Sequence, residues 1–211
     1  MRTVGITGRS GCGKSTVTAC FVEHGIPVAD ADQISREILL PGSPVVAALA
    51  ERFGADILEP ETGCLKRRLL ADRAFATPEG KNALDAITHP EIIRRVRMAR
   101  QAAEEAGSLL FGVDGAVIVG TELEAECDDL LVVTAPYEVS VERIARRDGI
   151  PPEMARRRLD AQTPEELLTA RASFRVENTG SLEALRHAAE AVLARLLAQA
   201  AGEKGGSGRQ I

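Results

Sequence analysis

The sequence predicts an α/β fold in which helices cover both faces of a five-stranded, mainly parallel sheet. Five short apolar segments alternate with segments of helical periodicity along the 211 residues, which is the pattern of successive strand–helix units in a three-layer fold. The composition is 45% hydrophobic, with no Trp, one Tyr and five Phe. The core must therefore be aliphatic, which suits helices packed on a parallel sheet.

Glycine and proline residues separate the predicted elements. Gly25 and Pro27 end the helix that follows the first strand, and Asp30 or Asp32 is placed to cap the next helix. Residues 55–65 are expected to form an irregular or hairpin segment. The predicted strands are residues 2–7, 27–29, 109–114, 130–134 and 173–177. The predicted helices are residues 14–24, 31–40, 45–53, 66–76, 78–88, 90–106, 137–147, 152–160, 164–171 and 182–200.

Charge and cysteine content narrow the range of partners. The 26 basic and 31 acidic side chains give a net charge of −5, which argues against double-stranded nucleic acid as a ligand. No apolar run approaches the roughly 20 residues of a membrane span, and no signal peptide is recognised. The four cysteines form no CxxC pair and no metal-ligand spacing with histidine. We expect a cytoplasmic protein that binds small molecules but neither nucleic acid nor membranes, as a monomer or weak homo-oligomer.

A phosphate-binding motif lies between the first predicted strand and helix. Residues 8–15, Gly-Arg-Ser-Gly-Cys-Gly-Lys-Ser, match G-x-x-x-x-G-K-[ST] in full. Glycines allow the backbone amides to turn towards a phosphate, and the helix N-terminus adds a favourable dipole. Lys14 is placed to reach the β- and γ-phosphates of ATP, Ser15 to bind Mg²⁺, and Thr16 to contact the α-phosphate. The other loop residues assigned to ATP are Gly8, Gly11, Cys12 and Gly13.

Neighbouring sequence excludes two other nucleotide-binding classes and leaves one question open. The dinucleotide fingerprint G-x-G-x-x-G cannot be placed on residues 8–16, and the guanine-binding N-K-x-D motif is absent from the sequence. Cys12 is either a small residue tolerated in the loop or a thiol of lowered pKa that reacts easily. The motif thus favours an ATP-dependent phosphotransferase with the three-layer fold of P-loop kinases.

Two carboxylates are expected near this loop. Asp30 and Asp32 follow the second strand, and we expect one to cap the next helix while Asp32 orients the acceptor hydroxyl and helps to hold Mg²⁺. Asp114 ends the apolar run 109–113, where P-loop proteins carry a second acidic residue beside the first strand. Asp114 is therefore a metal and substrate ligand, or else a turn former at the strand end.

With these pieces placed, the sequence resembles dephospho-CoA kinases over about residues 2–195. The P-loop is common to many families, whereas the Asp-Ala-Asp segment, the His-Pro pair and the final Phe-to-Asn-x-Gly block are specific in combination. The segments that carry the resemblance include residues 8–16, 25–36, 41–44, 53–54, 67–68, 88–90, 161–164 and 170–180.

The resemblance implies phosphorylation of the ribose 3′-hydroxyl of dephospho-CoA by ATP and Mg²⁺, giving coenzyme A and ADP. It implies that Asp32 is the catalytic carboxylate, acting with Lys14. Arg143 and Arg147 resemble arginines that close on ATP, and Asn178 lies near the adenine. Arg67 and His89 fall, with Asp32 and Asp114, on the acceptor side. The metal ligands implied are Ser15, Asp32 and Asp114.

One kinase domain of residues 1–201 is expected. Its core comprises about residues 1–30, 107–136 and 172–201, its acceptor-side helical segment about residues 31–106, and its lid about residues 137–171. The lid is rich in arginine and interrupted by prolines, as suits a helical segment that closes over ATP. Residues 202–211 include Gly-Gly-Ser-Gly and are expected to form a disordered tail.

The sequence departs from the family at two places. After the strand that ends at Asp114 the family has Pro-Leu-Leu-Phe-Glu, where this chain has Ala-Val-Ile-Val-Gly at 116–120; Glu122 or Glu124 is a candidate replacement for the lost glutamate. Arg9 occupies a loop position where the family has glycine, and it either reaches the phosphates or crowds the acceptor. These departures leave two alternatives open: a kinase of another nucleoside-like acceptor, or an ATP-binding module without catalysis.

Overall fold

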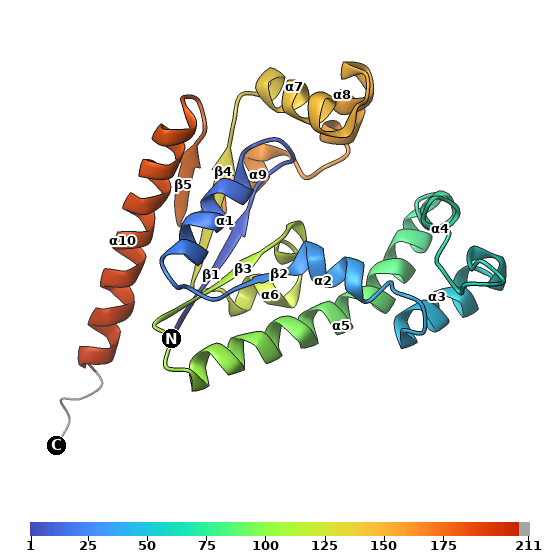
Figure 1. Cartoon of the computed structure of the whole chain (residues 1–211), viewed down its shortest axis with the longest axis horizontal. Helices are drawn as coiled ribbons and strands as arrows, with labels where there is room; N and C mark the ends of the chain where they lie inside the picture. The colour runs from blue at the N-terminus through green and yellow to red at the C-terminus, as the bar shows by residue number, and fades with distance from the viewer. Residues whose placement is uncertain (207–211) are drawn as a thin grey trace. The chain divides into compact units, whose positions relative to one another are not determined.

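The computed structural model describes residues 1–206 and contains the predicted five-stranded sheet (Figure 1). Its strands stand in the order β2-β3-β1-β4-β5, and β1 pairs in parallel with β3 and β4, as β4 does with β5. The predicted α/β fold class is confirmed, with strand bounds that differ by at most one residue from those expected. The strands are β1 (Arg2–Thr7), β2 (Val28–Asp30), β3 (Leu110–Asp114), β4 (Asp129–Thr134) and β5 (Phe174–Glu177).

The chain forms two compact units. One consists of Met1–Ala29 and the chain from Arg100 onwards, and the other is Asp30–Ala99. The first unit contains α1 (Lys14–Glu23), the 3₁₀ turn η2 (Ala116–Ile118), α6 (Glu122–Glu126), α7 (Tyr137–Asp148), α8 (Pro152–Asp160), α9 (Glu165–Thr169) and α10 (Leu182–Gly206). The second contains α2 (Ala31–Glu37), α3 (Pro44–Phe53), the 3₁₀ turn η1 (Ala55–Ile57) and α4 (Arg67–Ala74), and α5 (Pro78–Glu105) begins in it.

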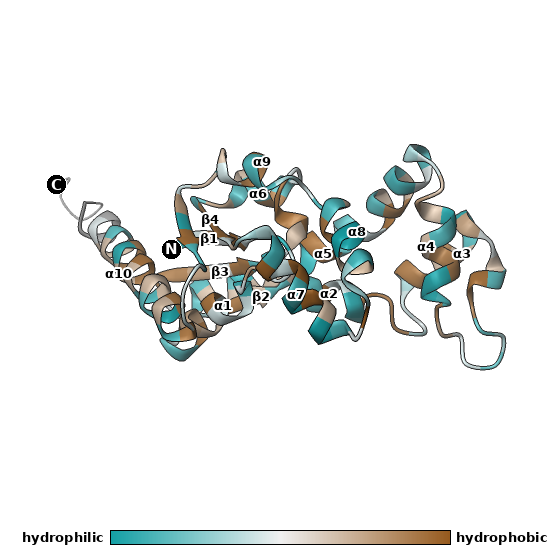
Figure 2. Ribbon diagram, turned by 90° about the horizontal axis from the view of Figure 1, so that it is seen from above, coloured by the Kyte–Doolittle hydropathy of each residue, from teal (hydrophilic) through white to brown (hydrophobic). Residues whose placement is uncertain are grey.

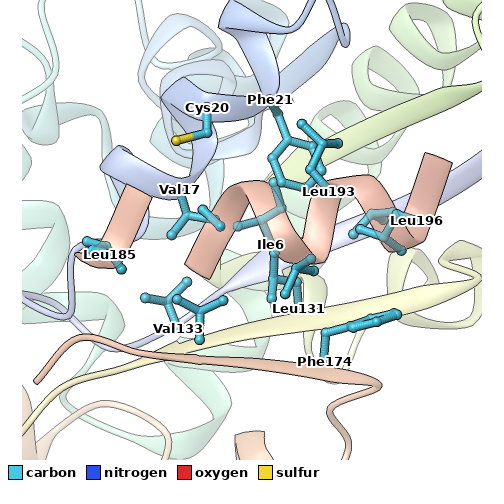
Figure 3. Close-up of a cluster of buried hydrophobic side chains, with 14 of the residues drawn as sticks. Ile6, Val17, Cys20, Phe21, Leu131, Val133, Phe174, Leu185, Leu193 and Leu196 are labelled. Carbon is cyan, nitrogen blue, oxygen red and sulfur yellow. The ribbon is translucent and has the colours of Figure 1, made fainter. Parts of the chain in front are cut away.

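The core of the first unit lies between the sheet and the helices α1 and α10 (Figure 3). Ile6 and Leu131 project from the strands, and Phe21 and Leu193 meet them from the two helices; each of these side chains is at most 1% exposed. Complete burial of such side chains contributes roughly 1.5–3 kcal/mol each. The core therefore fixes the start of α1, which carries the phosphate-binding loop, against the end of β1.

A third layer covers the opposite face of the sheet. Side chains alternate across a strand, so Gly5 faces away from the core that Val4 and Ile6 fill. A Cβ atom on Gly5 would lie 3.2 Å from Ile118 of η2 and 3.2 Å from Cys127. All five residues of β3 are buried, and Figure 2 colours its apolar residues brown, as expected for a strand that is covered on both faces.

Gly112 allows the edge strand to approach β3 closely. Its N–H donates to the Pro27 carbonyl at 2.9 Å, and a Cβ atom at this position would lie 2.9 Å from Val28 Cγ2. A larger residue would push β2 away from the sheet. Glycine has a low strand propensity, but at position 112 it is required by packing. The close approach places β2 against β3, the strand that ends in Asp114.

The second unit is helical and buries apolar side chains such as Leu49, Ile57 and Leu70, with polar contacts at its surface. Asp30 caps α2, because its Oδ1 accepts from the Gln33 N–H at 2.8 Å, which confirms the predicted capping role for one of the two aspartates. Arg73 donates to both carboxylate oxygens of Asp56, at 2.7 and 2.6 Å. An antiparallel bridge between Leu58 and Leu65 confirms the hairpin expected at 55–65.

The arginine-rich segment of residues 137–171 has a small core of its own. Val141 and Ile144 of α7 pack against Ala155 and Leu159 of α8, and each of these four side chains is buried. The α7–α9 segment, as we call these residues, thereby forms a packed helical layer beside the end of β4 (Figure 1). Among the described residues, 1–206, no helix is both long enough and apolar enough to cross a membrane.

The helices differ from the sequence-based prediction in two places. Residues 78–88 and 90–106 form one helix, α5, with Pro90 inside it. Pro90 is exposed, and the buried Ile92, Ile93 and Val96 that follow supply enough apolar contact to offset the loss of one backbone hydrogen bond. The 3₁₀ turn and short helix at 116–126 were not predicted.

The last helix, α10, runs to Gly206, and residues 207–211 of the tail expected at 202–211 lie outside the described residues. Leu196 and Ala200 are buried and anchor the helix, and adding further turns to an anchored helix costs little.

We predict that Pro90→Ala stabilises the protein. Alanine restores a donor for the helix interior and removes the ring clash with the preceding turn, so the free energy of unfolding should rise by about 1–3 kcal/mol. Urea unfolding followed by far-ultraviolet circular dichroism measures this change. Pro78→Ala is the matched control, because Pro78 is the first residue of α5, where proline is tolerated. A loss of stability in Pro90→Ala would contradict this account.

Candidate active site

The phosphate-binding loop joins β1 to α1 and requires glycine at two of its positions. Gly11 and Gly13 have φ values of 80° and 98°, which residues with a Cβ atom rarely adopt. A Cβ atom on Gly11 would lie 2.6 Å from the Ser140 carbonyl oxygen, and one on Gly13 would lie 2.5 Å from Asn178 Nδ2. The loop is therefore shaped by residues of α7 and by the turn after β5.

Asp114 lies beside Lys14, as predicted from its position after a buried strand. The register of β1 and β3 places Asp114 opposite Ile6, two residues before the loop begins. Lys14 Nζ donates to one carboxylate oxygen of Asp114, and Thr18 Oγ1 donates to the other at 2.7 Å. Asp114 is only 5% exposed, and a carboxylate at that depth needs a cation or hydrogen-bond donors to be stable.

The residues at the loop suit a magnesium ion that is held mainly by phosphates. Ser15, at the start of α1, is exposed and supplies a hydroxyl, while Asp114 supplies carboxylate oxygens. Mg²⁺ usually binds through one or two carboxylates together with substrate phosphates and water, not in a cage of protein ligands. Residues 1–206 contain no group of three or more His, Cys, Asp or Glu side chains that could hold a metal.

Two predicted nucleotide-binding side chains are bonded directly to the loop backbone. Arg143 Nη1 donates to the Gly11 carbonyl at 3.1 Å, and Asn178 Nδ2 donates to the Cys12 carbonyl at 2.8 Å. Arg143 and Asn178 also lie within 3.5 Å of each other. These two bonds use carbonyl oxygens of the loop and leave its anion-binding capacity to backbone N–H groups.

A cavity of about 240 Å³ adjoins this arrangement. It groups four predicted nucleotide-binding residues, since its lining includes Gly13, Thr16, Arg143 and Asn178, and two leucines at the start of α10 complete it. A larger cavity, of about 420 Å³, is lined by Arg9 together with Glu165, Glu166 and Glu177. The three carboxylates make the larger cavity a poor site for phosphate, and the residues predicted to bind nucleotide line the smaller one.

The remaining predicted site residues are not gathered at the loop by any described contact. Arg147 pairs with Asp148 at 2.7 Å, and its side chain is 62% exposed. Asp32 lies in the first turn of α2 and Arg67 is the first residue of α4, where it is exposed. His89 lies inside α5, with its Nε2 3.5 Å from Asp85 Oδ1. Asp32, Arg67 and His89 belong to the Asp30–Ala99 unit.

Sequence reasoning missed three residues of this site. Thr18, which bonds Asp114, stands four residues after Lys14 and therefore on the same face of α1; this spacing could have identified it. Leu182 and Leu185, the apolar wall of the smaller cavity, are three residues apart at the start of α10. Their spacing marks a helix face, but nothing in it distinguishes a ligand site from core.

Cys12 is not a reactive thiol of lowered pKa, which settles the question that the sequence left open. The side chain is 2% exposed. Burial raises its pKa to about 11, even though the Lys14 backbone N–H and ammonium act in the opposite direction. The interpretation of Cys12 as a small residue packed within the loop is therefore correct.

Glu124, one of the two candidates for the glutamate lost after Asp114, has a local role. Its Oε2 accepts from the Gly120 N–H at 2.7 Å, and the same oxygen pairs with Arg171 at 2.8 Å. These contacts hold the turn between η2 and α6.

Comparisons with known proteins agree with these observations. A sequence profile described as dephospho-CoA kinase matches residues 2–184. A dephospho-CoA kinase from Anaeromyxobacter dehalogenans is 42% identical over an alignment that covers the whole of this chain and 96% of the relative.

Two solved structures are also similar to this chain. TT1252 from Thermus thermophilus has a TM-score of 0.72 and 35% identity, covering 92% of this chain and 97% of its own. A dephospho-CoA kinase from Campylobacter jejuni has a TM-score of 0.60 and 26% identity, with the same coverage of both chains.

We predict that Cys64, which is exposed, is alkylated long before Cys12. At pH 7.5 only on the order of one Cys12 side chain in 10³–10⁴ carries a thiolate, whereas Cys64 is open to solvent. Iodoacetamide labelling with peptide mass mapping distinguishes the two. Cys64→Ser should abolish the fast labelling in native protein, and all remaining cysteines should label in urea. Equal rates at Cys12 and Cys64 in the native protein would refute the assignment.

Proposed function

The chain belongs to the dephospho-CoA kinase family, and we propose that it transfers the γ-phosphoryl group of ATP to the ribose 3′-hydroxyl of dephospho-CoA, giving coenzyme A and ADP. The observation that carries this proposal is a family match that spans residues 2–184. It includes the complete phosphate-binding loop and the whole Asp30–Ala99 unit, where the expected acceptor-side residues lie.

Lys14 is assigned to the phosphates of ATP. Phosphoryl transfer depends mainly on positioning and on neutralising charge that spreads over the γ-phosphate oxygens. Lys14 starts α1, so its ammonium and the N-terminal amides of the helix offer positive charge to the same anion. We assign the β-phosphate to the backbone of the loop between Gly8 and Ser15, and the α-phosphate to Thr16.

Asp32 is assigned the role of orienting the acceptor hydroxyl and accepting its proton. Asp30 and Asp32 are both placed for this role by sequence, but the Asp30 carboxylate caps α2. Asp32 is the carboxylate of the pair that the capping contact does not use. Arg67 and His89, in the same unit as Asp32, are assigned to the acceptor, and Asp114 to the acceptor side next to Lys14.

Ser15 and Asp114, with Asp32, are assigned as the protein ligands of Mg²⁺. When bound, the ion would neutralise charge on the transferring phosphates. Hydroxyl and carboxylate oxygens are the donors that this hard cation prefers. The adenosine end of ATP is assigned to the smaller cavity, where Arg143 and Asn178 supply polar groups, and Arg147 is assigned to ATP from the resemblance alone.

We predict that the purified protein releases ADP from ATP·Mg²⁺ when dephospho-CoA is added, and that the product carries one additional phosphate at the ribose. A coupled ADP assay with mass spectrometry of the product tests this. A panel of nucleosides and nucleotides serves as the control. Turnover with a nucleoside but not with dephospho-CoA would overturn the acceptor assignment, and ATP binding without any turnover would overturn the enzyme assignment.

We predict that Lys14→Ala and Asp32→Asn each lower kcat by on the order of 10²-fold or more, the usual effect of removing a charge-stabilising or acid–base group. Asp32→Asn should bind ADP as tightly as the native protein. Asp30→Asn is its matched control, because asparagine caps helices as well as aspartate does, and its turnover should stay close to native. Near-native turnover in Asp32→Asn would remove Asp32 from catalysis.

A further inference from the structure

The end of α8 is bonded to the start of the phosphate-binding loop through the side chain of Gln162. Gln162 Oε1 accepts from the Ser10 backbone N–H at 2.8 Å, and Gln162 Nε2 donates to Ser10 Oγ at 2.7 Å. One amide group therefore pairs with both the backbone and the side chain of a single loop residue. Such a two-point contact fixes orientation as well as distance, because the amide must lie in one plane with both partners.

Arg9 adds a third bond between the same two segments. Its guanidinium donates to the Leu159 carbonyl, in the last turn of α8. A cation at the C-terminal end of a helix is favoured, because the final carbonyls lack helical partners there. Neither alternative considered for Arg9 from the sequence describes this contact, because the side chain is directed to α8. A glycine, which the family has at this position, could not make the bond.

These bonds reach a pair of helices that pack against each other. Leu159 and Ile144 are both buried in the small core of the α7–α9 segment, so the end of α8 is coupled to α7 by packing. Helix α7 contacts the loop again one residue further on, where Arg143 donates to the Gly11 carbonyl at 3.1 Å. Residues 9, 10 and 11 of the loop are thus held by the two ends of one packed helical layer.

We propose that Gln162 is a positioning residue for nucleotide binding, which holds the phosphate-binding loop in its binding conformation through Ser10. The proposal rests on the nucleotide-binding part of the proposed function and is independent of the acceptor. A loop that is already ordered before the ligand arrives loses less conformational entropy on binding than a mobile loop does. Preorganisation of the loop therefore increases the affinity for the nucleotide. A neutral amide suits this task, because a carboxylate at position 162 would add negative charge near the phosphates.

The first test replaces Gln162 by methionine, which has a similar volume but makes no such hydrogen bonds. We expect the affinity for ADP, measured by calorimetry, to fall about 10-fold, the scale for losing two hydrogen bonds to partly buried partners. The KM for ATP should rise in parallel, while the KM for dephospho-CoA stays unchanged and kcat changes by less than about 3-fold. The melting temperature without ligand should barely change, whereas its increase with ADP should shrink.

A double-mutant cycle separates positioning from a general effect on the fold. Ser10→Ala removes one of the two bonds, so alone it should weaken ADP binding by about 3-fold, but it should add little in the Gln162→Met background. Gln162→Glu keeps both contacts with Ser10 if the Ser10 hydroxyl donates. It should therefore recover part of the affinity for ADP that Gln162→Met loses. Thr163→Val, at the exposed neighbouring position, is the matched control and should bind ADP as the native protein does.

The outcomes distinguish this inference from the proposed function. Unchanged or tighter ADP binding in Gln162→Met overturns the positioning role, since tighter binding would mean that the contact opposes the nucleotide. Additive losses in the cycle also overturn it, because Gln162 would then act through something other than Ser10. Native protein that binds ADP but does not phosphorylate dephospho-CoA overturns the assigned reaction and leaves the role of Gln162 standing.

Discussion

The ion pair between Lys14 and Asp114 is the contact on which the site depends. It joins the first residue of α1 to the last residue of β3, which pairs directly with the strand that leads into the loop. Asp114 is buried, so its carboxylate is stable only while Lys14 and Thr18 satisfy it. The two charges that we assign to the triphosphate and its metal are therefore also needed by the fold itself, so a change at either residue should affect stability as well as activity.

Much of this arrangement could be predicted because it depends on residues that are close together in the sequence. The loop motif fixed the positions of Lys14 and Ser15 at a helix start, and the apolar run before Asp114 predicted a strand beside β1. The strand bounds followed from apolar runs between glycine and proline residues. Pro90 was the exception among the breakers, since burial of Ile92, Ile93 and Val96 outweighs a local rule that takes no account of tertiary contacts.

The rest could not be predicted, because it depends on contacts between residues far apart in the chain. Ser10 and Gln162 are separated by 152 positions, and Cys12 and Asn178 by 166. No periodicity links such pairs. Cys12 illustrates the consequence: adjacent lysine and helix amides suggest an acidic thiol, whereas burial by the segments that fold over the loop reverses the direction of the pKa shift.

The burial of Cys12 has a consequence for redox chemistry. Peroxides and disulfides react with thiolates, and their attack is limited by how much thiolate is exposed. A phosphate-binding loop whose sulfur is protonated and covered by protein is insensitive to mild oxidants, although a cysteine lies in the middle of it. Among the cysteines of residues 1–206, Cys64 in the Asp30–Ala99 unit is the exposed one, so glutathionylation would mark the protein at a distance in sequence from the residues assigned to the triphosphate.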